Sequence, residues 1–300
     1  MDNLSKLSNP RAKMGDQELE VFNGLRVICC VLIILGNSYF YTMRSPIQNL
    51  EVLQEWIQSS FFSLVLSADL FVDMFFWISA FLASYQLLVR MRLNDGALPH
   101  NKLMLIFSRF VRLWPLYTFT LLFYWRVMPM FGGEGPLFFE YEKMNECKEH
   151  WVWHVTFLNN IIPWRSKDGC MPWTWYLACE MQFFILLPFL VQNYFGNRQR
   201  FWVLIILFWA IAAVFSISVI VKNSLSASYF TYKDEYWTIF YEKPFARLPA
   251  YLIGVVWGCT YYSYKHERDE EDQLFSGMTP DQIHRRRQQL NLEEEDPGSY

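Results

Sequence analysis

Residues 201–221 read FWVLIILFWAIAAVFSISVIV, a run of 21 residues without a charged side chain. A hydrocarbon core about 30 Å thick is crossed by a helix of roughly 20 largely apolar residues. Backbone polar groups at that depth must be bonded within the segment, which a helix achieves. The run therefore predicts a transmembrane helix, and with it an integral membrane protein.

Outward from this run, five further apolar blocks predict an all-α polytopic membrane helix bundle of about six transmembrane helices. The chain of 300 residues is 53% hydrophobic, yet its mean hydropathy is only +0.09, so the apolar residues are concentrated in blocks between polar loops. An even number of spans places both termini on the same side of the membrane. The predicted spans are Leu25–Tyr41, Ala68–Val89, Leu103–Val127, Trp173–Tyr194, Phe201–Val221 and Leu248–Tyr264.

Basic residues identify one side, which we call the inner side, because short loops rich in Lys and Arg stay on the side of synthesis. The first loop on the opposite, outer side carries only Arg44. Within that loop Leu50–Phe62 is short and amphipathic, which predicts an interfacial helix leading into the second span. The inner basic residues are Lys6, Arg11, Lys13, Arg90, Arg92, Lys102, Arg198 and Arg200.

The longest outer loop, Pro129 to Pro172, carries Cys147 and Cys170. A bridge between them would close a loop of about two dozen residues and stabilise the fold by roughly 3 kcal/mol in the chain-entropy picture. The outer side would then face a compartment that permits disulfides; two free thiols are the alternative. The remaining cysteines lie in predicted spans, where a thiol acts as a small hydrophobic group: Cys29, Cys30, Cys179 and Cys259.

Charge and histidine placement argue against two classes of function. The formal net charge is −3 and the basic residues form short clusters, so no nucleic-acid binding is predicted. His150 and His154 stand four residues apart, near Glu146 and Glu149, but no third ligand is evident and no metal site is predicted.

Three regions follow from the composition: an N-terminal polar segment (1–22), a transmembrane domain (23–265) and a polar C-terminal tail (266–300). In the tail, Thr279 as N-cap, Pro280 at the first helical position and Gln282 predict a short helix to about Leu292. A helix this polar is marginal alone in water, so we expect a protein partner to hold it.

Several stretches together resemble one family over about Phe22 to Gly258: FNGLRVICCVLIILGNSYFY, ADLFVDMFFWISAFLASYQLL, SRFVRLWPLYTFTLLF, ECKEHWVWHVTFLNNIIPW, GCMPWTWYLACEMQFFILLPFL and EKPFARLPAYLIGVVWG. In kind and order they are similar to the membrane acyltransferase type 3 superfamily, and more closely to its nose-resistant-to-fluoxetine-like branch.

The resemblance implies a Gly-His-Ser or Gly-His-Thr step in the first span, whose histidine acts as general base on the acceptor hydroxyl in acyl transfer from acyl-CoA. The corresponding step here is Gly36-Asn37-Ser38. An amide can hydrogen-bond but cannot take a proton near neutral pH. Asn37 is therefore a degenerate catalytic position, which we expect to be buried.

The resemblance also implies that Arg109 and Arg112, an Arg-x-x-Arg step, bind the CoA phosphates. A spacing of three puts both on one helix face, although both could equally serve lipid headgroups at the interface. Asp73 and Glu180 lie in predicted spans and should face the interior and find partners. A structural ion pair with Arg26 or Arg112 is expected for them, with a functional site as the alternative.

A family fold of about ten spans is also implied, and the later spans would follow KPFARLPAYLIG, so the chain reads as truncated. With Asn37, this predicts a catalytically inactive, acyltransferase-like structural or accessory subunit of a larger membrane complex, in the mitochondrial inner membrane and its respiratory chain. The expected partners are other membrane protein subunits and phospholipids, with no cofactor.

Two alternatives remain open. An active O-acyltransferase would move an acyl group from acyl-CoA to a lipid or sugar hydroxyl, with its base supplied by another residue or chain. In the other alternative, the polar interior binds a lipid or an acyl chain without chemistry.

Overall fold

The computed structural model describes residues 17–43, 59–99, 101–131, 147–164, 170–225, 236–274 and 282. Within these residues there are helices, turns and loops and no strand, so the chain is an all-α membrane helix bundle, as predicted. The elements are α2 (Gln17–Met43), α4 (Ser60–Leu66), α5 (Ala68–Arg92), α6 (Lys102–Leu122), π-helical η2 (Phe123–Val127), α7 (Met128–Phe131), α9 (Cys147–Val155), η4 (Pro172–Thr174), α10 (Trp175–Gly196), α11 (Arg198–Asn223), π-helical η5 (Trp237–Tyr241) and α13 (Pro244–Leu274).

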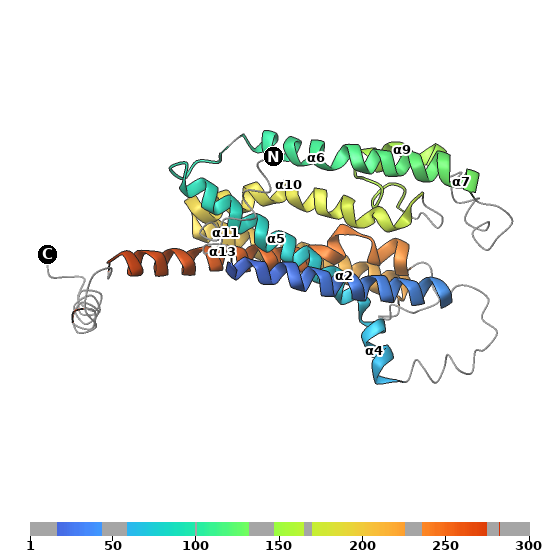
Figure 1. Cartoon of the computed structure of the whole chain (residues 1–300), viewed down its shortest axis with the longest axis horizontal. Helices are drawn as coiled ribbons and strands as arrows, with labels where there is room; N and C mark the ends of the chain where they lie inside the picture. The colour runs from blue at the N-terminus through green and yellow to red at the C-terminus, as the bar shows by residue number, and fades with distance from the viewer. Residues whose placement is uncertain are drawn as a thin grey trace.

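Four helical stretches are long and apolar enough to cross a membrane: Leu19–Tyr39, Ala68–Arg92, Pro172–Gly196 and Arg198–Asn223. They match the first, second, fourth and fifth predicted spans. The third and sixth are also helical, as α6 and α13, and lie alongside the others in the bundle (Figure 1). They are less apolar because α6 carries basic residues and α13 continues into the charged sequence KHERDEED.

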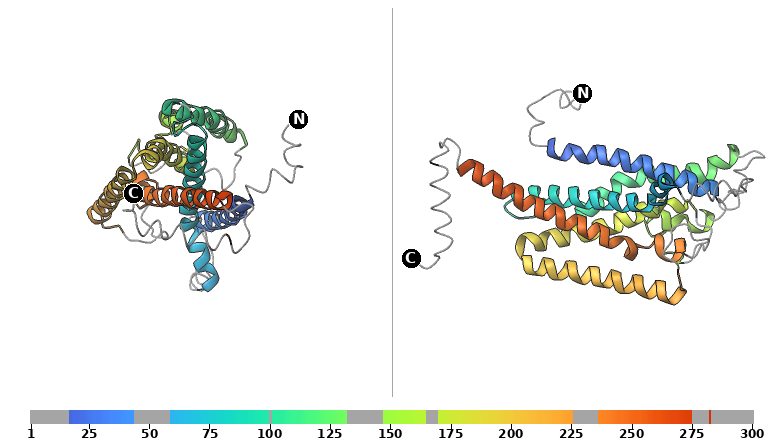
Figure 2. Two further views of the ribbon diagram at one scale, coloured as in Figure 1. Left: turned by 90° about the vertical axis from the view of Figure 1, so that its left-hand side faces the viewer. Right: turned by 90° about the horizontal axis from the view of Figure 1, so that it is seen from below.

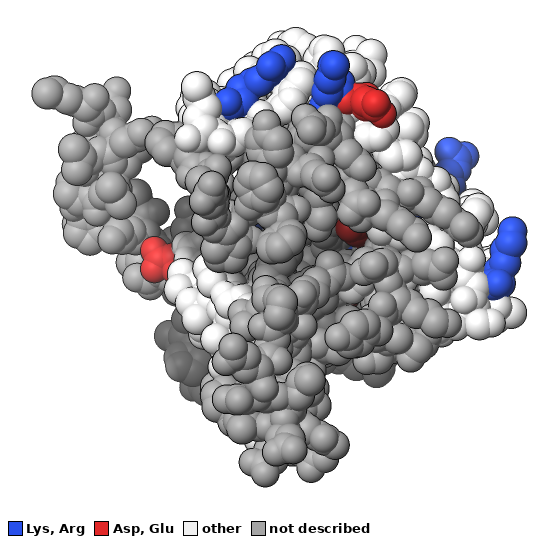
Figure 3. All heavy atoms as spheres, turned by 90° about the vertical axis from the view of Figure 1, so that its right-hand side faces the viewer, with Lys and Arg blue, Asp and Glu red and all other residues white. Residues whose placement is uncertain are grey.

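The helices run alternately up and down the bundle, so α2 begins and α13 ends at the same end (Figure 1). Arg90 and Arg92 close α5 at this end, and Lys102 opens α6 there. The described residues of the predicted inner loops, Arg90, Arg92, Lys102, Arg198 and Arg200, therefore lie at one end of the bundle. On the described part of the opposite face, charged side chains are scattered along the rim (Figure 3).

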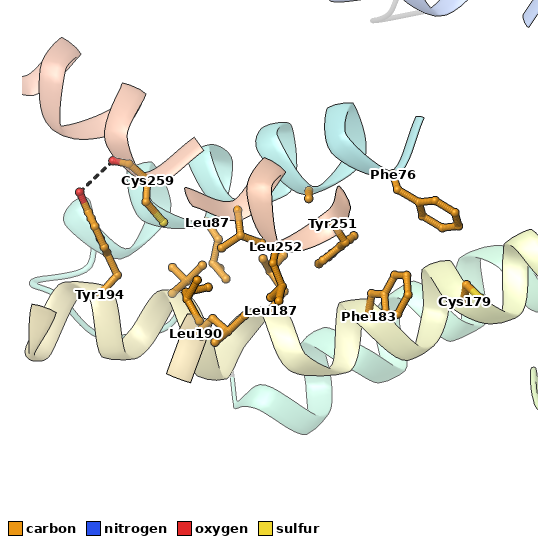
Figure 4. Packing of buried hydrophobic residues seen from close by; sticks show 14 of the residues in the cluster. Phe76, Leu87, Cys179, Phe183, Leu187, Leu190, Tyr194, Tyr251, Leu252 and Cys259 are labelled. Carbon is orange, nitrogen blue, oxygen red and sulfur yellow. Dashed lines mark hydrogen bonds between the residues drawn. The ribbon is translucent and has the colours of Figure 1, made fainter. Parts of the chain in front are cut away.

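The core lies between α5, α10 and α13, where Phe76, Phe183, Leu187, Tyr251 and Leu252 pack together (Figure 4). Within its most apolar window, Pro172–Gly196 is 61% buried, whereas Leu19–Tyr39 and α11 are each only 11% buried. Accordingly α2 and α11 lie at opposite edges of the bundle (Figure 2). Most of the surface of these two helices faces outward.

Small residues set the closest contact, between α5 and α13. A methyl group at Gly254 would lie 2.8 Å from Ala80 Cβ, and one at Gly258 would meet Ser84 Oγ and lie 2.5 Å from the Phe81 carbonyl. Glycines four residues apart let two membrane helices approach until their backbones touch. The Gly-x-x-x-Gly step of α13 therefore positions it against Ala80 and Ser84 of α5.

Two predicted elements lie largely outside the described residues. Of the interfacial helix Leu50–Phe62 only residues 59–62 are described, and there a short helix, α4, begins after an N-cap at Ser59. The predicted tail helix ending at about Leu292 is outside the described residues except for Gln282.

Candidate functional site

Asn37 lies on an exposed face of α2, which corrects the expectation that this position is buried. Its Nδ2 donates to the Ile33 carbonyl one turn earlier, at 3.0 Å. Gly36 is the residue of this step that faces inward, since a methyl group there would meet Ala68 Cβ. One residue of helix corresponds to a turn of about 100°, so burying Gly36 rotates Asn37 out of the contact.

Glu180 is buried where α5, α6 and α10 meet, with a relative exposure of 5%. Its Oε1 accepts hydrogen bonds from Ser79 Oγ and from Arg109 Nη2. The Arg109 guanidinium also lies over the Phe184 ring, 4.2 Å from its centroid. Glu180 Oε2 is buried and has no hydrogen-bond partner among the described residues. Three helices are thus tied together at one carboxylate.

Arg112 lies on the same helix as Arg109 but does not share this environment. Its side chain is exposed, whereas that of Arg109 is only 23% exposed. Three residues along a helix still separate two side chains by about 60° around the axis, and α10 covers only the Arg109 side. Arg109 is engaged with Glu180, and the binding of phosphate or lipid headgroups by Arg109 and Arg112 stays a prediction.

Asp73 forms the second ion pair, with Arg247 of α13. Arg247 Nη1 lies 3.0 Å from both carboxylate oxygens, and its Nε donates to the Tyr241 carbonyl at 3.1 Å. The guanidinium stacks 3.9 Å from the Tyr241 ring centroid and 5.5 Å from that of Trp175. The partners expected for the two carboxylates, Arg26 and Arg112, are therefore replaced by Arg247 and Arg109. Arg26 acts on Glu180 only through its charge.

A cap covers the outer ends of α6 and α10; we call residues 147–164 and 170–174 the outer cap. Cys147 and Cys170 form the predicted disulfide, with Cα atoms 4.7 Å apart. Both cysteines are buried against Leu121 and Tyr124. The bridge therefore joins the two segments of the cap to each other and packs them against Leu121 and Tyr124.

His154 lies beneath this cap and is 3% exposed. Its Nδ1 is 2.9 Å from the Tyr117 hydroxyl of α6 and 3.3 Å from Thr174 Oγ1 of η4. Burial lowers the pKa of His154 to about 4, and the neighbouring charge of His150 adds to the effect. The ring is therefore neutral at neutral pH, and its Nδ1 and the Tyr117 hydroxyl share a hydrogen bond whose donor depends on the tautomer of the ring.

A second polar network joins the cap to the core. Asn160 and Gln182 exchange amide hydrogen bonds, and Asn160 Nδ2 also donates to Cys179 Sγ at 3.1 Å. Lys243 Nζ donates to the Asn160 carbonyl at 2.7 Å and lies 4.7 Å from the Trp164 ring centroid. Burial lowers the pKa of Lys243 to about 8.

Sequence reasoning missed Arg247, Lys243 and the role of His154. A signal for the first two exists, because both lie within EKPFARLP, just before the last span, where a charge next to an apolar block needs a partner. The sequence around His154 gives no comparable signal for its buried contacts. Among the described residues, no group of three or more His, Cys, Asp or Glu side chains could hold a metal.

Comparisons with known proteins agree on one family. A family model for an acyltransferase domain (type 3) matches residues 19–269. Nose resistant to fluoxetine protein 6 of Caenorhabditis elegans is 24% identical over 271 residues, an alignment that covers 82% of this chain and 32% of that protein. The chain therefore spans about a third of the length of this relative. No solved structure matches the present chain.

Proposed function

Because the chain belongs to the type 3 acyltransferase domain family, we propose that it is a membrane protein of that fold which does not itself transfer acyl groups and serves as a structural subunit of a larger membrane assembly. The observation that supports this proposal most directly is the placement of Asn37. At the step where the family resemblance implies a histidine base, the amide faces outward and is bonded to its own helix.

The ion pairs support the same proposal. Glu180 and Asp73 each accept from a guanidinium of another helix, Arg109 and Arg247 respectively. A buried charge loses several kcal/mol of solvation, which only a well-placed partner offsets. These charges are therefore used to fasten α5, α6, α10 and α13 to one another.

The exposed surface of α2 supports the proposal that the protein has a partner in the membrane. Asn37 and Ser38 are exposed on α2, among Val27, Val31 and Ile34. Polar side chains within apolar spans usually face other protein, and hydrogen bonds between helices then contribute to association. We propose that other membrane protein subunits and phospholipids share this surface.

The assembly is tested by its size in a mild detergent. The protein, extracted from its native membrane, should co-migrate with other subunits in a complex much larger than its own 36.0 kDa. Our proposal also includes the mitochondrial inner membrane and its respiratory chain, so that complex should fractionate with inner-membrane markers. Recovery of the chain alone would contradict the subunit role, and recovery of its complex with another membrane would contradict only the location.

One feature favours a second candidate function, acyl transfer from acyl-CoA to a lipid or sugar hydroxyl. Glu180 Oε2 is buried and without a partner among the described residues, and a carboxylate oxygen in that condition can accept a hydroxyl proton. Under this alternative Glu180 replaces the missing base. Glu180→Gln would then abolish turnover.

A further inference from the structure

The outer cap joins the bundle through a buried histidine, and this junction lies outside the groups that the proposed function uses. His154 closes α9 and faces Tyr117 of α6 and Thr174 of η4. Thr174 Oγ1 is already committed, because it donates to the Met171 carbonyl at 2.8 Å and accepts from Asn159 Nδ2 at 3.1 Å. The junction thus consists of neutral groups that fit a neutral ring.

The surroundings of His154 are apolar and aromatic. The Tyr117 ring stacks on Phe157 with centroids 5.1 Å apart, and Phe157 is 2% exposed. Phe110 packs edge-on against Phe157 at 5.7 Å. A charged imidazolium placed here would lose most of its hydration and would have only hydroxyl oxygens in exchange.

Among the residues that the structure describes, the titratable groups that face His154 do not offset such a charge. On α9 itself His150 lies one turn earlier and adds positive charge when protonated. From α6 the titratable group that faces His154 is the Tyr117 phenol, which is neutral near pH 7. The side chain of η4 that faces His154 is Thr174, which does not titrate. Cys147 and Cys170 are bonded to each other and carry no charge.

We propose that the outer cap is a pH-sensitive closure, held shut by neutral His154 and released when the outer compartment becomes acidic. Release would expose the disulfide and the outer ends of α6 and α10. The bridge would keep the two segments of the opened cap joined to each other.

The direction in which pH changes the stability of the closed cap follows from proton binding. The closed cap holds His154 at a pKa of about 4, whereas an exposed histidine has a pKa of about 6.5. The open form therefore binds more protons between these values, so closure is fully stable above about pH 6.5 and weakens as the pH falls towards 4. The equilibrium constant for opening should rise by about 30-fold between pH 7.5 and pH 5.

Access to the buried disulfide reports opening, because Cys147 is 0% and Cys170 is 1% exposed. The full-length protein in detergent or lipid nanodiscs is treated with a phosphine reductant, which acts without a thiolate, and the released thiols are counted with a maleimide. After correction with the rate for a small disulfide, reduction should be about 30-fold faster at pH 5 than at pH 7.5. His150→Gln is the matched control and should keep this ratio, while His154→Gln should bring it close to one.

The proposal would be overturned if the ratio of reduction rates at pH 5 and pH 7.5 were the same for the protein and for the small disulfide. It would also be overturned if wild type and His154→Gln showed the same change of reduction rate with pH. If His154→Gln is reduced rapidly at both pH values, amide exchange of the wild-type protein decides. Loss of protection in residues 147–164 at pH 5, with α5 unchanged, supports a pH-sensitive closure. Equal protection of residues 147–164 at both pH values contradicts it.

Discussion

At the scale of single residues, two pairs of opposite charges lie in the described interior. Glu180 meets Arg109, and Asp73 meets Arg247 through two contacts of 3.0 Å. Buried pairs of this kind add little net stability compared with apolar residues, but the loss of one partner leaves an uncompensated charge. Each pair therefore works as a specific fastening between two helices.

Replacing Arg109 tests this directly. Arg109→Ala should lower the free energy of unfolding by about 3–5 kcal/mol, because Glu180 is left buried without its guanidinium. Arg112→Ala is the matched control on the same helix and should change it by less than about 0.5 kcal/mol, since that side chain is exposed. Thermal unfolding in detergent measures both. Equal effects of the two substitutions would mean that Arg109 is not a fastening residue.

The sequence predicts that Asp73 and Glu180 face inward, because a lipid-facing carboxylate is costly. Their partners could not be predicted, since Arg247 is 174 positions from Asp73 and its approach depends on the register between α5 and α13. The sequence also could not predict that Asn37 faces outward. It depends on which side of α2 meets α5, and an apolar run without strong periodicity does not specify a side.

At the scale of elements, close packing of α5 against α13 organises the bundle. Gly254 and Gly258 allow the contact, and their neighbours across the interface are Ala80 and Ser84. Without a hydrophobic driving force inside a bilayer, such close van der Waals packing supplies much of the association between helices.

Gly258→Ala should therefore destabilise the protein by about 1–3 kcal/mol, because the added methyl group collides with Ser84 Oγ and with the Phe81 backbone. Gly24→Ala is the matched control on α2, where nothing lies within 4 Å of the added methyl group. That substitution should be neutral or stabilising by up to about 1 kcal/mol. The denaturation midpoints of the two variants compare them, and a stability loss in Gly24→Ala equal to that in Gly258→Ala would contradict the packing assignment.

Most elements follow from the sequence because roughly 20 apolar residues in a bilayer leave a helix as the simplest solution. The least apolar helices, α6 and α13, were nevertheless predicted, because their apolar blocks are interrupted by few charges. Local geometry was not predictable, as in the π-helical turns η2 and η5. Such turns depend on neighbouring helices, which a linear pattern does not contain.

At the scale of the whole molecule, the bundle has a buried centre and two outward-facing edges. Its centre is formed by α5, α10 and α13, while α2 and α11 bury only 11% of their most apolar windows. The family resemblance identified the class of protein from its motifs. The loss of the expected base at Asn37 is the feature that points from catalysis towards a structural role.

Acyl transfer by the purified protein is the most direct test of that role. The chain is reconstituted into phospholipid vesicles and supplied with labelled acetyl-CoA or palmitoyl-CoA, and labelled lipid and free CoA are measured over time. We predict no turnover above protein-free vesicles. Labelled product that disappears in Glu180→Gln, in a variant shown to remain folded, would contradict the structural role and establish an acyltransferase.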